Sequence, residues 1–246
     1  MRQKYTNTTH MDILLIGYGK MGKTIQRLAE EMGHHISGVI DTDNPMDLAT
    51  YAKSSQVAIE FTRPESAYHN LKSCLDLGLP VVSGTTGWLD HYTDICELSR
   101  MKETGFFYAS NYSIGVNIFF AINKKLAALM GQYQEYSAQV DETHHIHKLD
   151  KPSGTAITTA EGLIENIPNI KDWALEKDED QLVKIVSHRE GEVYGKHTVH
   201  YNSPIDEIIL THNAHTRDGF AVGAIRAAEW IIDKKGPHVM NDMLGL

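Results

Sequence analysis

The first half of the chain alternates short apolar runs with stretches in which apolar residues recur at helical spacing. Each run has the length of a buried strand, and Ile25, Leu28 and Met32 show the helical spacing that follows the first run. The predicted strands are residues 12–16, 36–40, 57–61, 79–82 and 106–109. Strands that alternate with helices predict an α/β fold, in which a parallel sheet is doubly wound by helices on both faces.

The pattern changes in the second half, where strands follow one another without long helices between them. In one strand His197, Val199 and Tyr201 alternate with polar neighbours, as in a half-exposed antiparallel strand. The predicted strands here are residues 133–143, 183–189, 192–202 and 207–213. The predicted helices are residues 116–130 and 223–235, and the acidic stretch 173–181 is predicted to be a surface loop. The pattern therefore predicts a second, α+β domain with a mixed or antiparallel sheet, from about residue 113 to 212.

The composition narrows the class of protein. The chain has 246 residues, of which 41% are hydrophobic and 22% charged, as in ordinary globular proteins. It has no apolar run of about 18 residues, and its first residues lack the apolar core of a signal peptide, so a membrane or secreted protein is not expected. Its 2 cysteines favour the cytoplasm, and its net charge of -9 argues against general nucleic-acid binding.

A glycine-rich turn, GYGKMG, follows the first predicted strand directly. Gly17, Gly19 and Gly22 stand between a strand and a helix, and Asp41 ends the next strand about twenty residues on. This arrangement predicts a site for a dinucleotide cofactor, whose pyrophosphate approaches the glycines and whose ribose hydroxyl bonds the acid. Residues 17–24 also match the phosphate-binding pattern GxxxxGKT of phosphotransferases, although that pattern does not require Gly19. A merely tight turn is a third interpretation.

The most reactive stretch is ETHHIHKLDKPSGT, residues 142–155. A strand through Lys148, a turn at 149–151 and a helix opening at Pro152 and Ser153 would place proton donors beside a helix amino end that suits an anion. On such a strand His145 and His147 would face one way and His144 the other. This combination suits reaction of a small acidic molecule.

Two other interpretations of the same stretch remain open. One is a solvated polar turn, in which the histidines do nothing. The other is a metal site, but neither Cys74 nor Cys96 lies in a recognisable metal-binding spacing, so no metal is predicted. An anionic substrate would be attracted by Lys148, Lys151 or Arg189.

Several motifs together carry a resemblance to a known family. They are GYGKMG from Gly17, EFTRPE from Glu60, SGTTGW from Ser83, SNYSIGVN from Ser110, ETHHIHKLDKPSGTA from Glu142, REGEVYGKHTV from Arg189 and RDGFAVGAIRAAEW from Arg217. The chain resembles the bacterial dihydrodipicolinate reductases over nearly everything after Met11. The resemblance implies reduction of 4-hydroxy-tetrahydrodipicolinate by NADH or NADPH in lysine and diaminopimelate biosynthesis.

The resemblance also implies roles for individual residues. His144 would be the catalytic histidine and Lys148 its partner in proton donation. The substrate's carboxylates would be held by His145, Ser153, Gly154 and Thr155. Together with the glycine turn, the predicted cofactor-binding residues are Gly17, Gly19, Lys20, Met21, Gly22, Asp41, Phe61, Thr62, Gly84, Thr85, Thr86, Ser110, Asn111 and Tyr112. The chain departs from the family's usual residues at Glu60, Lys151 and Glu190.

The resemblance further implies a domain division and an assembly. Residues 216–246 would join 11–112 in the dinucleotide-binding domain, and 113–215 would bind substrate and form a homotetramer through its sheets. A phosphotransferase and a nucleotide sensor without turnover are the alternatives, and the HHIHK cluster favours an enzyme because a sensor needs no proton donors.

Overall fold

The computed structural model describes residues 10–42 and 48–246. The chain forms two compact units, which are treated separately below. One is formed by the chain up to Ile114 and again from Asp218 onward, and the other by Gly115–Arg217.

The described residues of the first unit form a six-stranded sheet in the order β11-β5-β4-β3-β1-β2, in which all neighbouring strands are parallel. The strands are β1 (Asp12–Ile16), β2 (His35–Ile40), β3 (Val57–Glu60), β4 (Val81–Ser83), β5 (Gly105–Tyr108) and β11 (Gly236–His238). The first five match the predicted strands within two residues. The short strand β11 was not predicted, because three residues are too few to show a periodic pattern.

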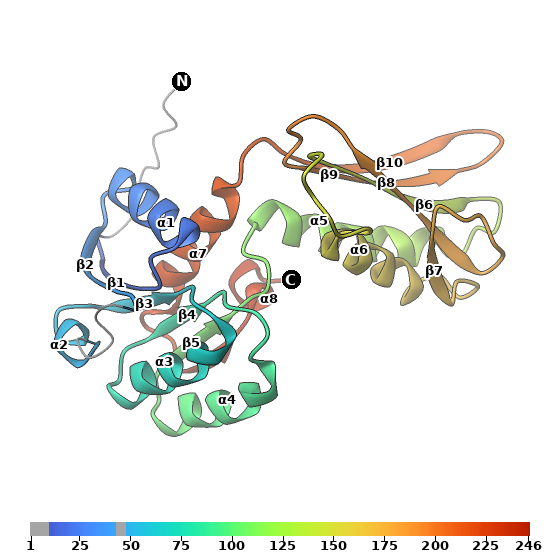
Figure 1. Ribbon diagram of the computed structural model, residues 1–246. Coiled ribbons are helices and arrows are strands. Elements are labelled where there is room, and N and C mark those ends of the chain that lie inside the picture. Colours follow the sequence, from blue (N-terminus) through green and yellow to red (C-terminus); the bar gives the residue numbers. More distant parts are fainter. Residues whose placement is uncertain (1–9, 43–47) are drawn as a thin grey trace. The chain divides into compact units, whose positions relative to one another are not determined.

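Helices cover both faces of this sheet (Figure 1). Ile13 and Leu15 point into a core shared with α1 (Lys20–Glu31), α7 (Asp218–Ile231) and α8 (Met240–Leu244). Leu14 and Ile16 point into a second core, toward α3 (Pro64–Asp76) and α4 (Tyr92–Met101). Because both of its faces are buried, β1 is apolar from Ile13 to Ile16. The unit is completed by α2 (Leu48–Ala52) and the 3₁₀ helix η2 (Leu89–His91).

The glycine turn between β1 and α1 has a backbone that only glycine fits. Gly17 has φ 94°, and a Cβ atom there would lie 2.0 Å from the carbonyl oxygen of Phe61. A Cβ atom on Gly22 would lie 2.2 Å from the carbonyl oxygen of Gly17. The turn is therefore packed against both the start of α1 and the chain that follows β3.

The second unit contains a five-stranded sheet in the order β10-β9-β6-β8-β7. Its strands are β6 (Ser137–His144), β7 (Asp172–Leu175), β8 (Leu182–Arg189), β9 (Gly195–Asn202) and β10 (Glu207–Ala214). β9 is antiparallel to β6 and β10, whereas β8 is parallel to β6 and β7. The predicted mixed sheet is confirmed.

Helices α5 (Ile114–Met130) and α6 (Gly154–Ile164) lie on one face of this sheet (Figure 1). Phe119 of α5 and Leu163 of α6 share a core with buried residues of β6, β8 and β9, including Val199 and Tyr201. The opposite face carries residues such as His200, which are half-buried or exposed.

Several predicted boundaries in this unit were wrong. The strands expected at 133–143 and 192–202 begin only at Ser137 and Gly195, because the residues before them form turns. The strand expected to run through Lys148 ends at His144, where the chain turns and the Lys148 N–H donates to the His145 carbonyl. The opposed facing of His144 and His145 on one strand therefore does not arise. The loop expected at 173–181 begins as strand β7, because Trp173 packs against the core and pairs with β8.

Candidate active site

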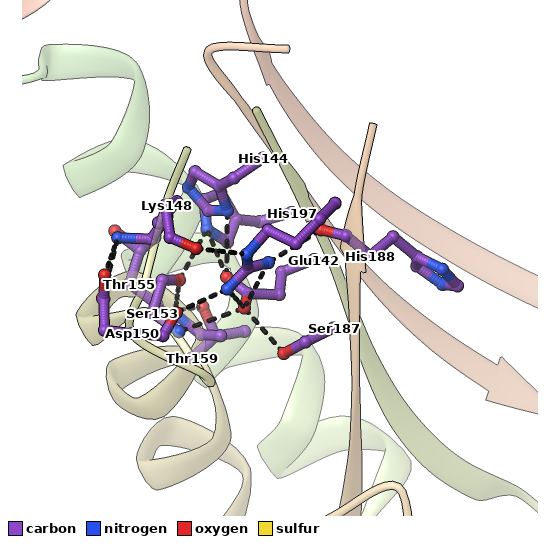
Figure 2. A network of polar contacts seen from close by, with 12 residues as sticks. Glu142, His144, Lys148, Asp150, Ser153, Thr155, Thr159, Ser187, His188 and His197 are labelled. Atoms are coloured by element: carbon purple, nitrogen blue, oxygen red, sulfur yellow. Dashed lines mark hydrogen bonds and ion pairs between the residues drawn. The ribbon is translucent and has the colours of Figure 1, made fainter. Parts of the chain in front are cut away.

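A buried polar cluster lies where β6, β8, β9 and the start of α6 meet (Figure 2). Strand register explains its composition, because Glu142 of β6 stands opposite Ser187 of β8 and His197 of β9. All three side chains face the helices, and Glu142 is fully buried. Ser153, which caps α6, and His144 at the end of β6 complete the cluster.

Glu142 is the centre of this cluster, and its two carboxylate oxygens have different surroundings. Oε1 accepts hydrogen bonds from the Ser153 N–H at 3.1 Å, from Ser187 Oγ at 2.7 Å and from the Arg189 guanidinium at 3.3 Å. Oε2 lies 3.1 Å from His144 Nδ1. Burial alone would raise the pKa of Glu142, but the contacts with His144, Ser153 and Ser187 hold it well below its ordinary value. Glu142 is therefore a carboxylate at neutral pH.

His197 is buried beside His144, with the two ring centroids 5.0 Å apart. Burial, together with the nearby His144, lowers the pKa of His197 to about 3, so its ring is neutral near pH 7. Ser153 Oγ accepts a bond from the Ala156 N–H and lies 3.2 Å from His197 Nε2. The neutral His197 ring can therefore accept the Ser153 hydroxyl at Nε2 in the tautomer that carries its proton on Nδ1.

The other basic residues of the stretch lie around this cluster. Lys148 Nζ is 2.8 Å and 2.7 Å from the two carboxylate oxygens of Asp150. His145 Nε2 lies 2.9 Å from the Arg217 guanidinium, and burial followed by Arg217 lowers the pKa of His145. His147 is exposed. The three histidines of this stretch are therefore in different environments. His144 is buried beside Glu142, His145 contacts Arg217, and His147 is exposed.

The Arg189 guanidinium is bonded to groups of this same unit, which its position in the sequence did not indicate. Besides Glu142, its guanidinium bonds the carbonyl oxygens of Lys148 at 3.1 Å and Asp150 at 2.5 Å. It thus fixes the turn that carries Lys148, instead of standing free to attract a substrate anion.

The start of α6 has the unpaired backbone donors that are expected at a helix amino end. Ser153 is the N-cap and its hydroxyl receives the Ala156 N–H, while the Ile157 N–H bonds the Ser153 carbonyl. Among the residues the structure describes, no partner is found for the N–H groups of Gly154 and Thr155. Because the Ser153 hydroxyl is used internally, Gly154 and Thr155 are the better placed to bind a carboxylate.

Glu142, His144 and His197 also form the one group, within the described ranges, with the residue types and spacing of a metal site. Their potential ligand atoms lie within 4.8 Å of one another. However, the Arg189 guanidinium is bonded to the same carboxylate, and its fixed positive charge opposes a second cation there. Sequence spacing could not have revealed this group, since the third member comes from another strand.

In the first unit, a cleft of about 590 Å³ opens at the carboxyl ends of the parallel strands. Its lining includes five of the predicted cofactor residues, Gly17, Gly19, Asp41, Phe61 and Thr62, together with Arg63, Ser66 and Asn70. Gly19 precedes the first turn of α1, whose N–H groups suit a pyrophosphate. Arg63 was not predicted, although a cation beside this cleft suits a phosphate.

The remaining predicted cofactor residues occupy the neighbouring loops and the first turn of α1. Lys20, Met21 and Gly22 belong to that turn, Gly84, Thr85 and Thr86 follow β4, and Ser110, Asn111 and Tyr112 follow β5. Thr85 and Tyr112 are buried. The Tyr112 hydroxyl donates to the Ser83 carbonyl at 2.6 Å, and Thr85 Oγ1 donates to Glu60 at 2.8 Å. These two side chains therefore support the loops from inside.

The turn does not have the geometry of a phosphotransferase loop. In the pattern GxxxxGKT the residues between the glycines form an open loop around phosphate, with the helix beginning near the lysine. Here α1 begins at Lys20, the Lys23 N–H already bonds the Gly19 carbonyl, and the Thr24 hydroxyl donates to the Lys20 carbonyl. The phosphotransferase alternative is therefore not favoured.

A doubly wound sheet with a glycine turn and an acid after the second strand is the architecture of nicotinamide-dependent oxidoreductases. The separate unit holds a buried carboxylate, two buried histidines and a helix end with unpaired N–H groups, which are groups able to transfer protons and bind anions. The fold and these groups together define the class of oxidoreductases.

Comparisons with known proteins identify the family. Residues 11–112 match the family model described as dihydrodipicolinate reductase, N-terminus, and residues 115–244 match dihydrodipicolinate reductase, C-terminus. The chain belongs to the dihydrodipicolinate reductase family, whose members use NADH or NADPH.

Relatives and a solved structure agree with this assignment. The 4-hydroxy-tetrahydrodipicolinate reductase of Christiangramia forsetii is 44% identical over 235 residues, which cover 95% of this chain and 98% of that protein. The same-named protein of Lawsonia intracellularis is 34% identical, with 95% and 98% covered. The dipicolinate-bound dihydrodipicolinate reductase of Paenisporosarcina sp. TG-14 has a TM-score of 0.73 at 21% identity, with 95% and 99% covered, which shows a shared fold.

Proposed function

We propose that this protein reduces 4-hydroxy-tetrahydrodipicolinate to tetrahydrodipicolinate with NADH or NADPH, a step of lysine and diaminopimelate biosynthesis. The observation that carries the proposal is the buried cluster in which His144 contacts a carboxylate beside the amino end of α6. It unites a proton donor with a binding site for anions, which reduction of an unsaturated dicarboxylate requires. A nucleotide sensor would need no such cluster.

In this proposal the chain's own residues bind, orient and protonate the substrate. The nicotinamide supplies a hydride when bound. His144 and Lys148 give the balancing proton to the reduced ring, and the Gly154 and Thr155 N–H groups hold a substrate carboxylate, with His145 and Ser153 beside them. Charged hydrogen bonds of this kind contribute about 1.5 to 3 kcal/mol each.

For the cofactor, we infer that the cleft lined by Gly17, Gly19 and Asp41 holds the adenosine half. The fit rests on the close backbone approach at the glycine turn, on the donors at the start of α1 and on the carboxylate of Asp41 for a ribose hydroxyl. Gly84, Thr86 and Ser110, on the loops after β4 and β5, would lie near the nicotinamide.

We also propose that the protein acts as a homotetramer in the cytoplasm. The second unit has an edge strand, β10, with Ile208 and Ile209 exposed, and the nearby Ile205 is 90% exposed, so this unit offers apolar surface to another copy. Light scattering would show a mass near four times the 27.6 kDa of the chain. Among the described residues, no helix is long and apolar enough to cross a membrane, and Cys74 and Cys96 are free thiols, which suits a reducing compartment.

The function is tested by the absorbance of the reduced nicotinamide. Purified protein, NADH and freshly prepared 4-hydroxy-tetrahydrodipicolinate should give a rapid fall in that absorbance, whereas omission of the substrate should give none. Dipicolinate, a stable planar relative of the substrate, should inhibit competitively. Cofactor binding without turnover over a broad range of substrate concentration would favour the sensor alternative instead.

A further inference from the structure

We propose that Glu142 is a positioning residue that fixes the proton-donating geometry of His144 and joins it to the anion-binding start of α6. This inference deepens the proposed function and rests on it for the identity of the reaction. The tautomer and orientation of the His144 ring can be measured without substrate, so they can be tested separately from the reaction.

The two oxygens of the Glu142 carboxylate differ in their hydrogen bonds, and the second oxygen lies beside His144. Glu142 Oε1 has three kinds of donor, namely the Ser153 N–H, the Ser187 hydroxyl and the Arg189 guanidinium. In the described part of the chain, neither Glu142 Oε2 nor His144 Nδ1 has a hydrogen-bond partner, and both atoms are buried. They lie 3.1 Å apart, whereas His197 Nε2 is 3.9 Å from the same oxygen, so His144 Nδ1 is the nearer partner of Oε2. A buried donor and acceptor at this distance are stabilised by pairing.

The contacts of Oε1 explain why Oε2 is held in place. Ser153, Ser187 and Arg189 come from three different segments, and together they prevent rotation of the carboxylate. The side chain of Arg189 is 11% exposed, so this charged contact is shielded from solvent. Oε2 is thereby aimed at His144 in a fixed direction (Figure 2).

Two neighbours hold the His144 ring from its other sides. The His197 ring meets it at an interplanar angle of 71°. Gly195 lies next to the far nitrogen, because a Cβ atom added there would be 3.1 Å from His144 Nε2. The absence of a side chain at Gly195 therefore leaves space beside Nε2, the atom that points away from the carboxylate.

The chemical consequence is that the two ring nitrogens have different functions. Nδ1–H donates to Glu142 in both charge states of the ring, so Nε2 is the atom that exchanges the proton. In turnover the substrate's 4-hydroxyl group and a proton from the neighbouring ring carbon leave as water, which forms a ring double bond. The hydride then adds to one carbon of that double bond, the Nε2–H bond of the imidazolium breaks and its proton goes to the other carbon, and His144 remains as the neutral Nδ1–H tautomer. Solvent returns the proton to Nε2.

The same carboxylate also links the two parts of the substrate site. Ser153 gives its N–H to Glu142 and its hydroxyl to His197, and it caps the helix whose first N–H groups bind the anion. Loss of the Glu142 charge should therefore affect the orientation of His144 more than the affinity for substrate, because Ser153 Oγ and the helix remain.

The direct test is the tautomer of His144, measured by nitrogen NMR of ¹⁵N-histidine-labelled protein in the absence of substrate. The signal is assigned among the 14 histidines by its loss in His144→Gln. At a pH where the ring is neutral, wild-type protein should show the Nδ1–H tautomer, and Glu142→Gln should show the Nε2–H tautomer or a mixture. The same tautomer in both proteins would overturn the proposal, whatever the substrate proves to be.

The kinetic test compares Glu142→Gln with Asp141→Asn, the same chemical change on the neighbouring residue, whose side chain lies on the opposite face of β6. Replacing the carboxylate that orients the histidine of a catalytic triad by its amide lowers kcat by about 10⁴, so kcat of Glu142→Gln should fall by at least about tenfold with the KM little changed. The alkaline limb of its pH profile should move to lower pH. The titratable groups that interact with His144 are Glu142, His145 and His197, with Arg189 bonded to Glu142, and only Glu142 differs in the variant.

Asp141→Asn should keep the wild-type pH profile, and NADH affinity should be unchanged in both variants. Because Glu142→Gln leaves the Arg189 charge without its counter-charge, a second variant, Glu142→Gln with Arg189→Gln, tests the same point if the single change unfolds the protein. An unshifted pH profile in a folded Glu142 variant would contradict the proposal. So would loss of activity on chelation with recovery on adding Zn²⁺, which would assign Glu142, His144 and His197 to a metal.

Discussion

At the scale of single residues, two buried glutamates show how surroundings decide the state of a carboxyl group. Glu60 is surrounded by uncharged donors, the hydroxyls of Thr62, Ser83 and Thr85, and burial raises its pKa. Glu142 is equally buried, and burial would raise its pKa, but the contacts with the ionisable His144, with Ser153 and with Ser187 lower it. The raised pKa of Glu60 favours its neutral form, whereas the lowered pKa of Glu142 favours the carboxylate, which is the form that pairs with an imidazolium.

Lys148 is the residue whose proposed part in proton donation depends most on local geometry. Its ammonium is paired with Asp150, and its backbone carbonyl is held by Arg189. Proton donation would require Lys148 to act together with His144. We expect His144→Gln and Lys148→Met each to lower kcat by at least about a hundredfold, the range of a general acid, while NADH affinity is retained.

The double variant decides between joint and separate functions. If the two residues act as a unit, its kcat should be far higher than the product of the two single losses predicts. Steady-state kinetics of all four proteins in one buffer measure this. Multiplicative losses would assign Lys148 to neutralising a substrate carboxylate.

Asp41 is expected to set the cofactor preference. Its carboxylate lines the cleft at the end of β2, where it suits a ribose hydroxyl and repels a 2'-phosphate. We predict a higher kcat/KM for NADH than for NADPH, with the preference reduced in Asp41→Asn. Arg63, Lys20 and Lys23 provide positive charge that reduces the difference. A preference for NADPH greater than about tenfold, or 1.4 kcal/mol, would refute the assignment.

At the scale of elements, the glycine turn provides a matched pair of substitutions. A Cβ atom at Gly17 would collide with the Phe61 carbonyl and meet a left-handed backbone, whereas at Gly19 it would meet nothing within 4 Å. Gly17→Ala should therefore destabilise the protein by about 1 to 3 kcal/mol, as strained backbone positions do, and weaken NADH binding.

Gly19→Ala should weaken NADH binding with little loss of stability, since the added methyl group obstructs only an approaching pyrophosphate. Thermal unfolding with and without NADH separates the two effects. Equal melting temperatures for the two unliganded variants would show that the turn tolerates a side chain at Gly17.

The elements that the sequence predicted well are those whose pattern is local. The strands β1, β3, β4 and β5 consist mostly of apolar residues because they are buried on both faces, and Ser153 was recognised as a helix cap from its neighbours. The end of β6 was not predictable in the same way, because β6 pairs with β8 only as far as Arg189, which is distant in the sequence, and the chain turns after His144. The same is true of the Glu142 cluster, whose members are joined by strand register.

At the scale of the whole molecule, the chain's return to the first unit was visible only through resemblance. The chain from Asp218 onward belongs to that unit, where α7 packs beside α1 and β11 extends the sheet next to β5. Hydrophobic periodicity predicts a helix near α7 but does not indicate which sheet it covers. Family motifs supply that information because they carry the tertiary arrangement with them.

Acid stability is a property of the whole chain that one buried histidine should influence strongly. Burial and the nearby His144 lower the pKa of His197 to about 3 from 6.5, so between these values the unfolded chain binds a proton that the folded chain does not. Stability must therefore fall as pH decreases through this window, and the contribution of His197 is fully present only above pH 6.5. Glu142, whose pKa is also lowered, acts in the same direction at lower pH, below its ordinary value.

We predict that His197 alone accounts for about 2 kcal/mol of the stability lost between about pH 7 and pH 5, from the difference in proton binding over that range. Urea unfolding at both pH values should show this loss in wild-type protein and in His69→Gln, a change at an exposed histidine on α3. In His197→Gln the loss should be smaller by that amount, because glutamine can still accept the Ser153 hydroxyl but takes up no proton. An identical pH dependence in all three proteins would mean that His197 is protonated in the folded state, and the hydrogen bond from Ser153 would then have to be assigned in the opposite direction.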